Sequence, residues 1–584
     1  MLSSIETQIP FTYGYLDLCS DDSPTPNETF TELLTGTRAQ YTNYVFNMNL
    51  NETCITSCVK KFKDYDIDDF QWFIDRHYYI NFYLDSLRAG RSKTQNHINK
   101  TYTSYISGIP LGFIEDDTYY VYNHYNIYIE VNKKDDKFQI VGFSIEPLSI
   151  KQKSPEQCES YIINDGTLLR RDRLNIEYQE LKEKEIYYSY DVIFIPSNKT
   201  FASRWDRYIR GGREYHWLGL IYSNILLFVF SFIVIFILSR AIKKDIEIYN
   251  QSVIGENEID EYGWKQVCND VFRKPKNLFI FSAFIGTGVQ LLLILIISLI
   301  FNLLGYIHPE QRGNLLNHMV IGFCFMSFFG GFISTTVYKN NKGREWLKNT
   351  IITALLFPGV CLFILIIVRI LFSIESSSVG LKISEILKLV ILWICISSPL
   401  IFFGSFLAIK RKNIKYPCKI NVLPTTINDK PWYLKLKYIV WLTGLIPFAT
   451  IIIEFIYLMG YMWRYQVFYL VSFLTLSIVF LVILSSEVSI IFIYLNLCKG
   501  DYNWWWKSFF VSASPALYIA IYSIYYFLYI DITRFTAIVV YFLIMALICS
   551  LTALICGSCG VISIFGFLLL YLFKNKNRLI NILN

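Results

Sequence analysis

The sequence predicts a membrane α-helical bundle of nine transmembrane helices, preceded by a mostly-β, sandwich-like lumenal domain. Hydrophobic residues make up 53% of the 584 residues and charged residues 17%, and the mean hydropathy is +0.36. Soluble domains contain about 25% charged residues, so this composition indicates a soluble part joined to a membrane part. Apolar runs of about 20 residues, the length that crosses a bilayer, all follow residue 216. The net charge of +7 is typical of Lys and Arg gathered on one side of a membrane, and we expect no nucleic-acid partner.

Residues 1–213 have the texture of a β-rich domain. The segments 119–132 ("YYVYNHYNIYIEVN") and 136–150 ("DKFQIVGFSIEPLSI") alternate and are rich in Tyr, Ile and Val, with a polar turn between them. The segment 185–196 ("EIYYSYDVIFIP") has the same character. Such alternation predicts strands with one buried face, and several of them together predict a sandwich-like fold.

The first transmembrane helix is predicted at 217–239, and the polar loop 240–277 follows it. The region 278–573 is predicted to form an eight-helix bundle, which the tail 574–584 follows. The eight spans of this bundle are predicted at 278–301, 315–337, 350–372, 386–408, 438–459, 467–497, 509–530 and 535–573.

Two of these spans, 467–497 and 535–573, are longer than a bilayer requires, so we expect them to tilt or to project beyond it. The last could instead be two short spans broken at "CGSCG" (556–560). Within this motif, Cys556 and Cys559 have the spacing of a metal site, but the small residues around them favour close helix packing.

The charges of the loops predict the orientation. If residues 1–213 lie outside the cytosol, the loops and the tail on the opposite side carry 24 Lys and Arg residues, whereas the remaining loops carry at most five. Because Lys and Arg collect on the cytosolic side, the β-rich domain is predicted to be lumenal and the tail 574–584 cytosolic. The start of the chain, "MLSSIETQIPFTYGYLDLC" (1–19), has no apolar signal core, so we expect the natural chain to begin upstream.

The predicted lumenal domain carries sites for two modifications of secreted proteins. The N-glycosylation candidates are Asn27, Asn51, Asn99 and Asn198, each followed at the second position by Thr. The disulfide candidates are Cys19, Cys54, Cys58 and Cys158. Four cysteines in an oxidising compartment allow three pairings, and free buried thiols are the alternative.

Three adjacent tryptophans stand out in "DYNWWWKSF" (501–509), in the predicted cytosolic loop before the eighth span. An indole is apolar with one N–H, so it favours the headgroup layer of a membrane. Trp504, Trp505 and Trp506 are therefore predicted interface anchors, with Lys507 reaching lipid phosphate. Binding of a partner protein is the alternative.

Three ionisable residues stand out inside predicted spans, where charge is costly and often functional. Glu454 lies toward the lumenal side of the sixth span, and Glu487 lies in the cytosolic half of the seventh. Each could form structural hydrogen bonds between helices, recognise the span of another membrane protein, or relay protons or ions. Arg369 lies near the lumenal end of the fourth span, where we expect it to snorkel to the interface.

The motifs of soluble enzymes are not evident in the sequence. The six histidines are scattered without ligand spacing, and "GTGVQ" (286–290) lies inside a span instead of after a strand. We therefore expect no catalytic, cofactor-binding or metal-binding residues and no enzymatic activity. If the chain has a chemical function, we expect it to be ion- or proton-coupled transport of a small solute or metal.

The chain resembles the nonaspanins, the transmembrane-9 superfamily that is also called the endomembrane protein 70 family. The resemblance runs nearly from end to end. The motifs that carry it include "TQIPFTYGYLDLC" (7–19), "VGFSIEP" (141–147), "SRWDRY" (203–208), "HWLGLIYS" (216–223), "GWKQVCNDVFRKP" (263–275), "SSPLIFFGS" (397–405), "IPFATIIIEFIY" (446–457), "SSEVSI" (485–490) and "DYNWWWKSF" (501–509).

The resemblance implies a multi-pass protein of Golgi and endosomal membranes. It implies a role in sorting or localising other transmembrane proteins, notably those with glycine-rich spans, and a link to adhesion and phagocytosis. The implied partners are membrane lipids, client transmembrane proteins and vesicle coat proteins at the cytosolic tail. Many nonaspanins end in Lys-X-Asp or Lys-X-Glu, whereas this chain ends in "NRLINILN" (577–584) and departs from that retention signal.

Overall fold

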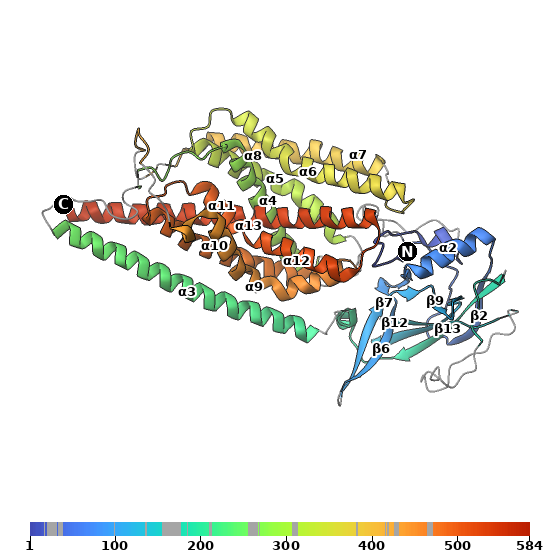
Figure 1. Cartoon of the computed structure of the whole chain (residues 1–584). Coiled ribbons are helices and arrows are strands. Elements are labelled where there is room, and N and C mark those ends of the chain that lie inside the picture. Colours follow the sequence, from blue (N-terminus) through green and yellow to red (C-terminus); the bar gives the residue numbers. More distant parts are fainter. Residues whose placement is uncertain are drawn as a thin grey trace.

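The structure is a computed structural model of the whole chain. It describes all residues except 17, 20–31, 33–38, 98–99, 135–136, 153, 155–176, 184, 209–212, 255–266, 268, 307–313, 381–382, 415, 417–419, 426–430, 464–470 and 584. Figure 1 shows a β-rich domain at one end of a long helical bundle, with the N-terminus at that domain and the C-terminus at the opposite end of the bundle. We call these two ends of the bundle the domain end and the distal end.

Within the described residues, nine helices are long and apolar enough to cross a membrane, which confirms the predicted class. Seven of the spans are single helices: α3 (Arg213–Ile254), α4 (Leu278–Leu303), α5 (Asn314–Asn340), α6 (Trp346–Ile374), α9 (Leu436–Met462), α10 (Val471–Cys498) and α13 (Phe535–Leu583).

The two other spans are interrupted. In the first, α7 (Ile383–Leu392) and α8 (Ser398–Lys410) are joined by π-helical residues Trp393–Ser397. In the second, α11 (Trp505–Ala513) meets α12 (Pro515–Ile530) at Ser514. Proline is tolerated at the start of a helix because it lacks an N–H that would have no partner there, and this explains where α12 begins.

The last span is one continuous helix, so the alternative of two spans broken at 556–560 is wrong. Small residues of this stretch allow neighbouring helices to approach closely. A Cβ atom at Gly557 would lie 2.6 Å from the ring of Phe509 in α11, and Gly288 of α4 faces the backbone of Leu554. Close packing of small residues holds helices together in lipid, where hydrophobicity provides no driving force.

The β-rich domain is built on a six-stranded mixed sheet with the strand order β2–β13–β11–β12–β6–β7. Strands β11 and β12 form an antiparallel hairpin, whereas β11 and β13 run parallel. The strands of this sheet are β2 (Glu52–Lys61), β6 (Gly90–His97), β7 (Lys100–Ser107), β11 (His124–Lys134), β12 (Lys137–Leu148) and β13 (Glu185–Pro196).

Smaller elements surround this sheet. They are the three-stranded sheet β1 (Leu2–Ser3), β3 (Tyr79–Ile80) and β8 (Ile109–Pro110), the hairpins β4 (Tyr83–Leu84) with β5 (Leu87–Arg88) and β9 (Gly112–Glu115) with β10 (Thr118–Val121), and the helix α2 (Asp64–Asp75). The prediction of a mostly-β domain before the bundle is therefore confirmed, and this domain consists of mixed β-sheets.

The domain rests on the bundle through the segment that contains "TQIPF" (7–11). The carbonyl of Pro10 accepts hydrogen bonds from the Ser377 hydroxyl at 2.6 Å and from the Ser378 N–H at 3.2 Å, both in the turn after α6. The Gln8 side-chain amide donates to the carbonyl of Trp463 at the end of α9, at 3.2 Å. The hydrophobic core of the domain also includes Phe372 of α6 and Val540 of α13, so the domain packs directly on the membrane helices.

Two of the four predicted cysteines form a disulfide bond, Cys19–Cys58, with 5.5 Å between their Cα atoms. Cys54 is also disulfide-bonded. Among the glycosylation candidates, Asn51 and Asn198 are exposed on the β-rich domain. The remaining candidates, Asn27, Asn99 and Cys158, lie outside the described residues.

Candidate functional site: the contact of α3 with the bundle

The first transmembrane helix, α3, lies along one side of the bundle (Figure 1) and packs against α9 and α10. Only 6% of the residues in its most apolar stretch are buried, compared with 50% in α9 and α10. Most of its surface is therefore available to lipid or to another helix.

Glu454 of α9 faces this helix close to the domain end. Its side chain is 2% exposed. A Cβ atom at Gly219 of α3 would lie 2.8 Å from a carboxyl oxygen of Glu454. The carboxyl group therefore sits directly against α3 at Gly219, and a methyl group there would require the Glu454 side chain or the helix to shift.

Glu487 of α10 faces the same helix farther along. The hydroxyl of Ser231 donates a hydrogen bond to its carboxyl oxygen at 2.7 Å. Between the two glutamates, the Ser223 hydroxyl donates to the carbonyl of Thr450 at 2.6 Å. We call this line of contacts the α3 seam, which consists of Gly219, Ser223, Ser231, Thr450, Glu454 and Glu487.

The α3 seam brings together the two glutamates that the sequence identified as candidates. A carboxyl group inside a membrane requires hydrogen-bond donors or close polar contacts, because water is excluded there. Here the surface against which both groups lie belongs to a peripheral helix that buries little of its own surface. The same groups could contact another helix with small or hydroxylated residues, or could bind and release protons.

Arg369 does not join this site, and the expectation that it snorkels to the interface is wrong. Its side chain is 1% exposed and forms an ion pair with Glu385 of α7 at 3.0 Å. It also donates hydrogen bonds to the carbonyls of Val379 and Gly380, at 2.8 and 3.1 Å. A buried guanidinium is tolerated when a carboxylate and carbonyls satisfy it. Sequence reasoning missed Glu385 because it fell one residue before the predicted fifth span, although an acid at the same end of the neighbouring span was the available signal.

The tryptophans at the distal end are also placed differently from the expectation. Trp504 and Trp505 are 1% and 5% exposed, so they are buried in protein and do not anchor it in the headgroup layer. The indole N–H groups of Trp504, Trp505 and Trp506 donate to the carbonyls of Val271, Arg273 and Lys276, at 2.8, 2.9 and 2.7 Å. The ammonium of Lys507 pairs with Asp501, and this ion pair takes the place of the expected lipid phosphate. The triplet therefore fixes the chain segment 269–276, whose carbonyls accept all three indole hydrogen bonds.

A second polar cluster lies in the β-rich domain, where sequence reasoning identified no site. His124 of β11 contacts Ser189 of β13 at 2.8 Å and Asp191 of β13 at 3.5 Å. These residue types are those of nucleophilic catalysis, but all three side chains are 0% exposed and a substrate cannot reach them. Their placement follows from the parallel pairing of β11 with β13, which sets His124 opposite Ser189.

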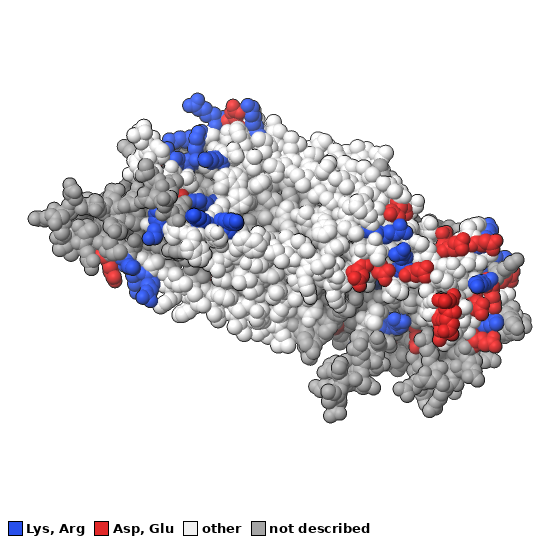
Figure 2. Space-filling model, viewed as in Figure 1, with Lys and Arg blue, Asp and Glu red and all other residues white. Residues whose placement is uncertain are grey.

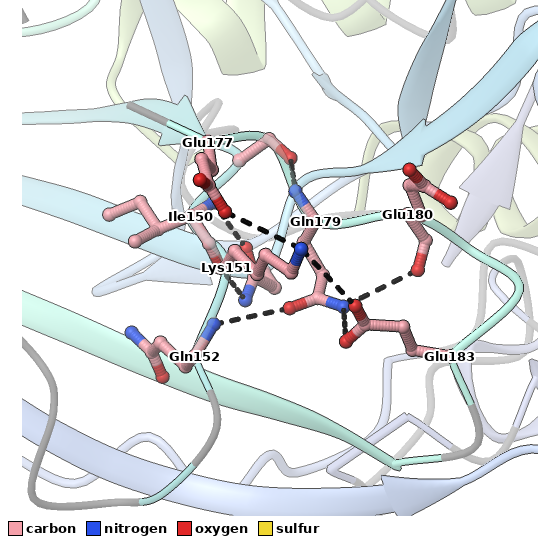
Figure 3. A network of polar contacts seen from close by, with 9 residues as sticks. Ile150, Lys151, Gln152, Glu177, Gln179, Glu180 and Glu183 are labelled. Carbon is pink, nitrogen blue, oxygen red and sulfur yellow. Dashed lines mark hydrogen bonds and ion pairs between the residues drawn. The ribbon is translucent and has the colours of Figure 1, made fainter. Parts of the chain in front are cut away.

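The side-chain amide of Gln152 donates a hydrogen bond to Ser189 of this cluster at 2.9 Å. Figure 3 shows the polar network that joins Gln152 and its neighbours to the chain beyond residues 155–176. The N–H of Gln152 donates to the side chain of Gln179 at 3.3 Å, and Gln179 donates to Glu183 at 2.7 Å. Lys151 lies 3.4 Å from the carboxylate of Glu177. The network ties the two ends of the β12–β13 connection together, which is a structural role. In the part of the chain that the structure describes, no group of three or more His, Cys, Asp or Glu residues could hold a metal ion.

The chain is similar in sequence to known membrane proteins along most of its length. A family profile described as endomembrane protein 70 matches residues 10–536. The chain is 30% identical to transmembrane 9 superfamily member 10 of Arabidopsis thaliana over 581 residues, which cover 97% of the chain and 91% of the relative. It is also 30% identical to member 4 of Homo sapiens over 593 residues, with the same coverage of both chains. No solved structure matches the chain.

Proposed function

Because the chain belongs to the endomembrane protein 70 family, the transmembrane 9 superfamily, we propose that it acts in the sorting or membrane localisation of other transmembrane proteins. Its clients are transmembrane proteins with glycine-rich spans, including adhesion and phagocytosis proteins that must reach the cell surface. It works in Golgi or endosomal membranes, and vesicle coat proteins bind its cytosolic tail.

In the proposed orientation the β-rich domain is lumenal and the distal end is cytosolic. The distribution of charge supports this orientation. On the face seen in Figure 2, Lys and Arg gather at the distal end, and Asp and Glu gather on the β-rich domain. Cytosolic ends of membrane proteins are enriched in Lys and Arg. This orientation also makes Asn51 and Asn198 accessible to glycosylation.

The contact between Glu454 and Gly219 carries the sorting proposal. It shows a buried carboxyl group pressed against a helix backbone at a glycine, on the helix of the bundle that is least buried. A client span with glycines at suitable positions presents the same kind of surface. Such a span can pack beside or in place of α3, where the carboxyl group recognises its exposed backbone.

Site-specific photo-crosslinking tests this proposal. A photoreactive residue on the lipid-facing side of α3, in place of Ile225, is expected to capture a client with a glycine-rich span. Capture of a matched client whose span glycines are replaced by Leu is expected to fall several-fold. Glu454→Gln is expected to lower both capture and the surface level of the client, whereas Gly359→Ala, on an open face of α6, leaves both unchanged. Equal capture of the two clients contradicts the proposal.

A proton- or ion-coupled transporter is the second candidate. The observation that favours it is the presence of two carboxyl groups, Glu454 and Glu487, at different depths along one helix contact. Flux measurements on the purified protein in liposomes with a pH gradient distinguish the two functions. Flux that both Glu454→Gln and Glu487→Gln abolish supports transport, whereas absence of flux together with lost client delivery supports sorting.

A further inference from the structure

Two apolar side chains outside the membrane helices are exposed to an unusual degree. Val422 and Leu423, in the connection between α8 and α9, are 96% and 80% exposed. They exceed every other large apolar side chain that the structure describes, including those on the lipid-facing surfaces of the helices, where Leu303 is 76% exposed. Apolar side chains exposed together outside the membrane region indicate an interaction surface.

The backbone on either side of this pair is held in place. The side chain of Arg273 donates a hydrogen bond to the carbonyl of Asn421 at 3.0 Å. The N–H of Thr425 donates to the carboxylate of Asp270 at 3.0 Å, and Asp270 pairs with Arg273 at 2.7 Å. The loop is therefore fixed before and after Val422 and Leu423, and these contacts leave both side chains pointing away from the protein.

The anchoring pair persists at cytosolic pH. Burial opposes ionisation of Asp270, but the hydrogen bonds from Thr425 and Arg273 outweigh it and hold the pKa of this carboxyl below its usual value. A carboxyl with a lowered pKa in the folded state stabilises the fold above its ordinary pKa, and this contribution is lost only as the pH falls through the lowered value. The loop remains anchored at any pH the cytosol reaches.

The tryptophan triplet supports this loop from behind. Its indoles donate hydrogen bonds to carbonyls of the segment 269–276, the same segment that supplies Asp270 and Arg273. Phe272 of this segment also stacks on Tyr416 of the α8–α9 connection, with 4.4 Å between ring centroids. The three tryptophans thus build the platform on which the exposed loop rests.

Positive charge precedes the apolar pair in the same connection. Lys410, Arg411 and Lys412 at the end of α8 are exposed, and the neighbouring turn between α5 and α6 adds exposed Lys342 and Arg344. Figure 2 shows Lys and Arg collected at this end of the bundle. Basic residues and exposed apolar side chains in one connection, whose two helices both cross the bilayer, match a surface of anionic phospholipid.

We propose that Val422 and Leu423 form a membrane-surface anchor, which inserts between the headgroups of anionic phospholipids at the distal end while Lys410, Arg411 and Lys412 bind the lipid phosphates. The anchor fixes the α8–α9 connection against the cytosolic leaflet. This inference rests on the proposed orientation but does not depend on client sorting, so failure of one leaves the other standing.

A fluorescent probe at the tip of the loop tests the anchor. The full-length protein carries Leu423→Cys in a background without label-accessible cysteines, is labelled with an environment-sensitive dye and is reconstituted in lipid nanodiscs. In phosphatidylcholine with phosphatidylserine, the emission is expected to shift to the blue, and lipids with a quenching group near the headgroup are expected to quench it several-fold. Both effects are expected to weaken in phosphatidylcholine alone and in the Arg411→Glu, Lys412→Glu double variant.

A label at Lys499→Cys, in the exposed turn between α10 and α11 at the same end, serves as the matched control and is expected to stay unquenched. Aqueous emission and no quenching of the Leu423→Cys label in either lipid mixture would overturn the proposal. Shielding that occurs only after cytosolic protein is added would overturn it too, because it identifies a protein partner. Replacement of Leu423 does not disturb folding, since this side chain buries so little surface.

Discussion

The α3 seam and the packing of α4, α5 and α8 join helices in lipid to very different extents. In the α4–α5–α8 group, glycines bring backbones into contact, and a Cβ atom at Gly286 would lie 2.5 Å from the carbonyl of Gly330. Buried polar side chains fill the same region, where Gln290 donates to Ser327 at 3.0 Å. The seam instead joins a mostly exposed helix to the bundle through a few polar contacts, beside an apolar cluster of Val234 with Leu484, Val488 and Ile491. The comparison indicates a rigid core and one helix whose contact can be exchanged.

The ion pair of Arg369 and Glu385 is the polar contact inside the bundle that contrasts most with the seam. Arg369→Ala leaves the Glu385 carboxylate buried without its charge partner, which costs about 3–5 kcal/mol of unfolding free energy. Thermal unfolding of the purified protein in detergent measures the loss.

Replacing both partners by methionine distinguishes a structural pair from an essential charge. The Arg369→Met, Glu385→Met double variant is expected to recover most of the stability, because no charge is then left buried. If Arg369→Ala is as stable as the wild type, this ion pair is no stronger than the contacts of the α3 seam. The bundle and the seam then do not differ in the strength of their polar contacts.

Close backbone contact in the core predicts the second-largest effect. Gly404 of α8 faces the backbone carbonyl of Phe328 in α5 so closely that a methyl group does not fit. Gly404→Ala is therefore expected to cost about 1–3 kcal/mol through overpacking. Gly359→Ala in α6, where nothing lies within 4 Å of the new Cβ atom, is the matched control and is expected to be neutral or slightly stabilising. Equal melting temperatures for the two variants would argue against a rigid core.

The sequence predicts the class of fold because its signals are local. Apolar length predicts the nine spans, and alternation of polar and apolar residues predicts strands such as β12 and β13. The residues that carry the α3 seam were only half predictable. Glu454 and Glu487 stand out as acids in apolar runs, but their partners Gly219 and Ser231 are ordinary residues of a span, and only the packing of α3 pairs them.

The sequence predictions for Trp504 and Arg369 were wrong because each side chain has two environments in which it is stable. An indole is stable both in the headgroup layer and in a protein interior where a carbonyl accepts its hydrogen bond. Trp504 lies in the protein interior, bonded to the carbonyl of Val271. An arginine near the end of a span can reach water or a buried carboxylate, and Arg369 pairs with the buried carboxylate of Glu385. In both cases the deciding partner is distant in sequence or in a neighbouring helix, which a pattern within one segment does not reveal.

Gly219 provides a direct test of how α3 is held. In Gly219→Ala the new methyl group would lie 2.8 Å from the Glu454 carboxyl oxygen, so the helix must shift or the side chain must turn away. We expect a loss of about 1 kcal/mol or less, because a surface-exposed helix can adjust where a core helix cannot. Crosslinking between cysteines at Val234 and Val488, which share one apolar cluster, is expected to fall clearly. If crosslinking is unchanged and Gly219→Ala lowers the unfolding free energy as much as Gly404→Ala does, the seam is as rigid as the core.

The hydrogen bond from Ser231 to Glu487 predicts the smallest effect. Hydrogen bonds between membrane helices contribute about 0.6 kcal/mol on average, so Ser231→Ala is expected to lower the unfolding free energy by about that amount. The variant also removes a donor from a carboxyl group that is half buried in the membrane region. Ser550→Ala, which removes a hydroxyl bonded only to its own helix on the exposed side of α13, is the control. If Ser231→Ala lowers the unfolding free energy as much as Arg369→Ala does, this hydrogen bond holds α3 firmly to the bundle. The proposal that the contact of α3 can be exchanged is then wrong.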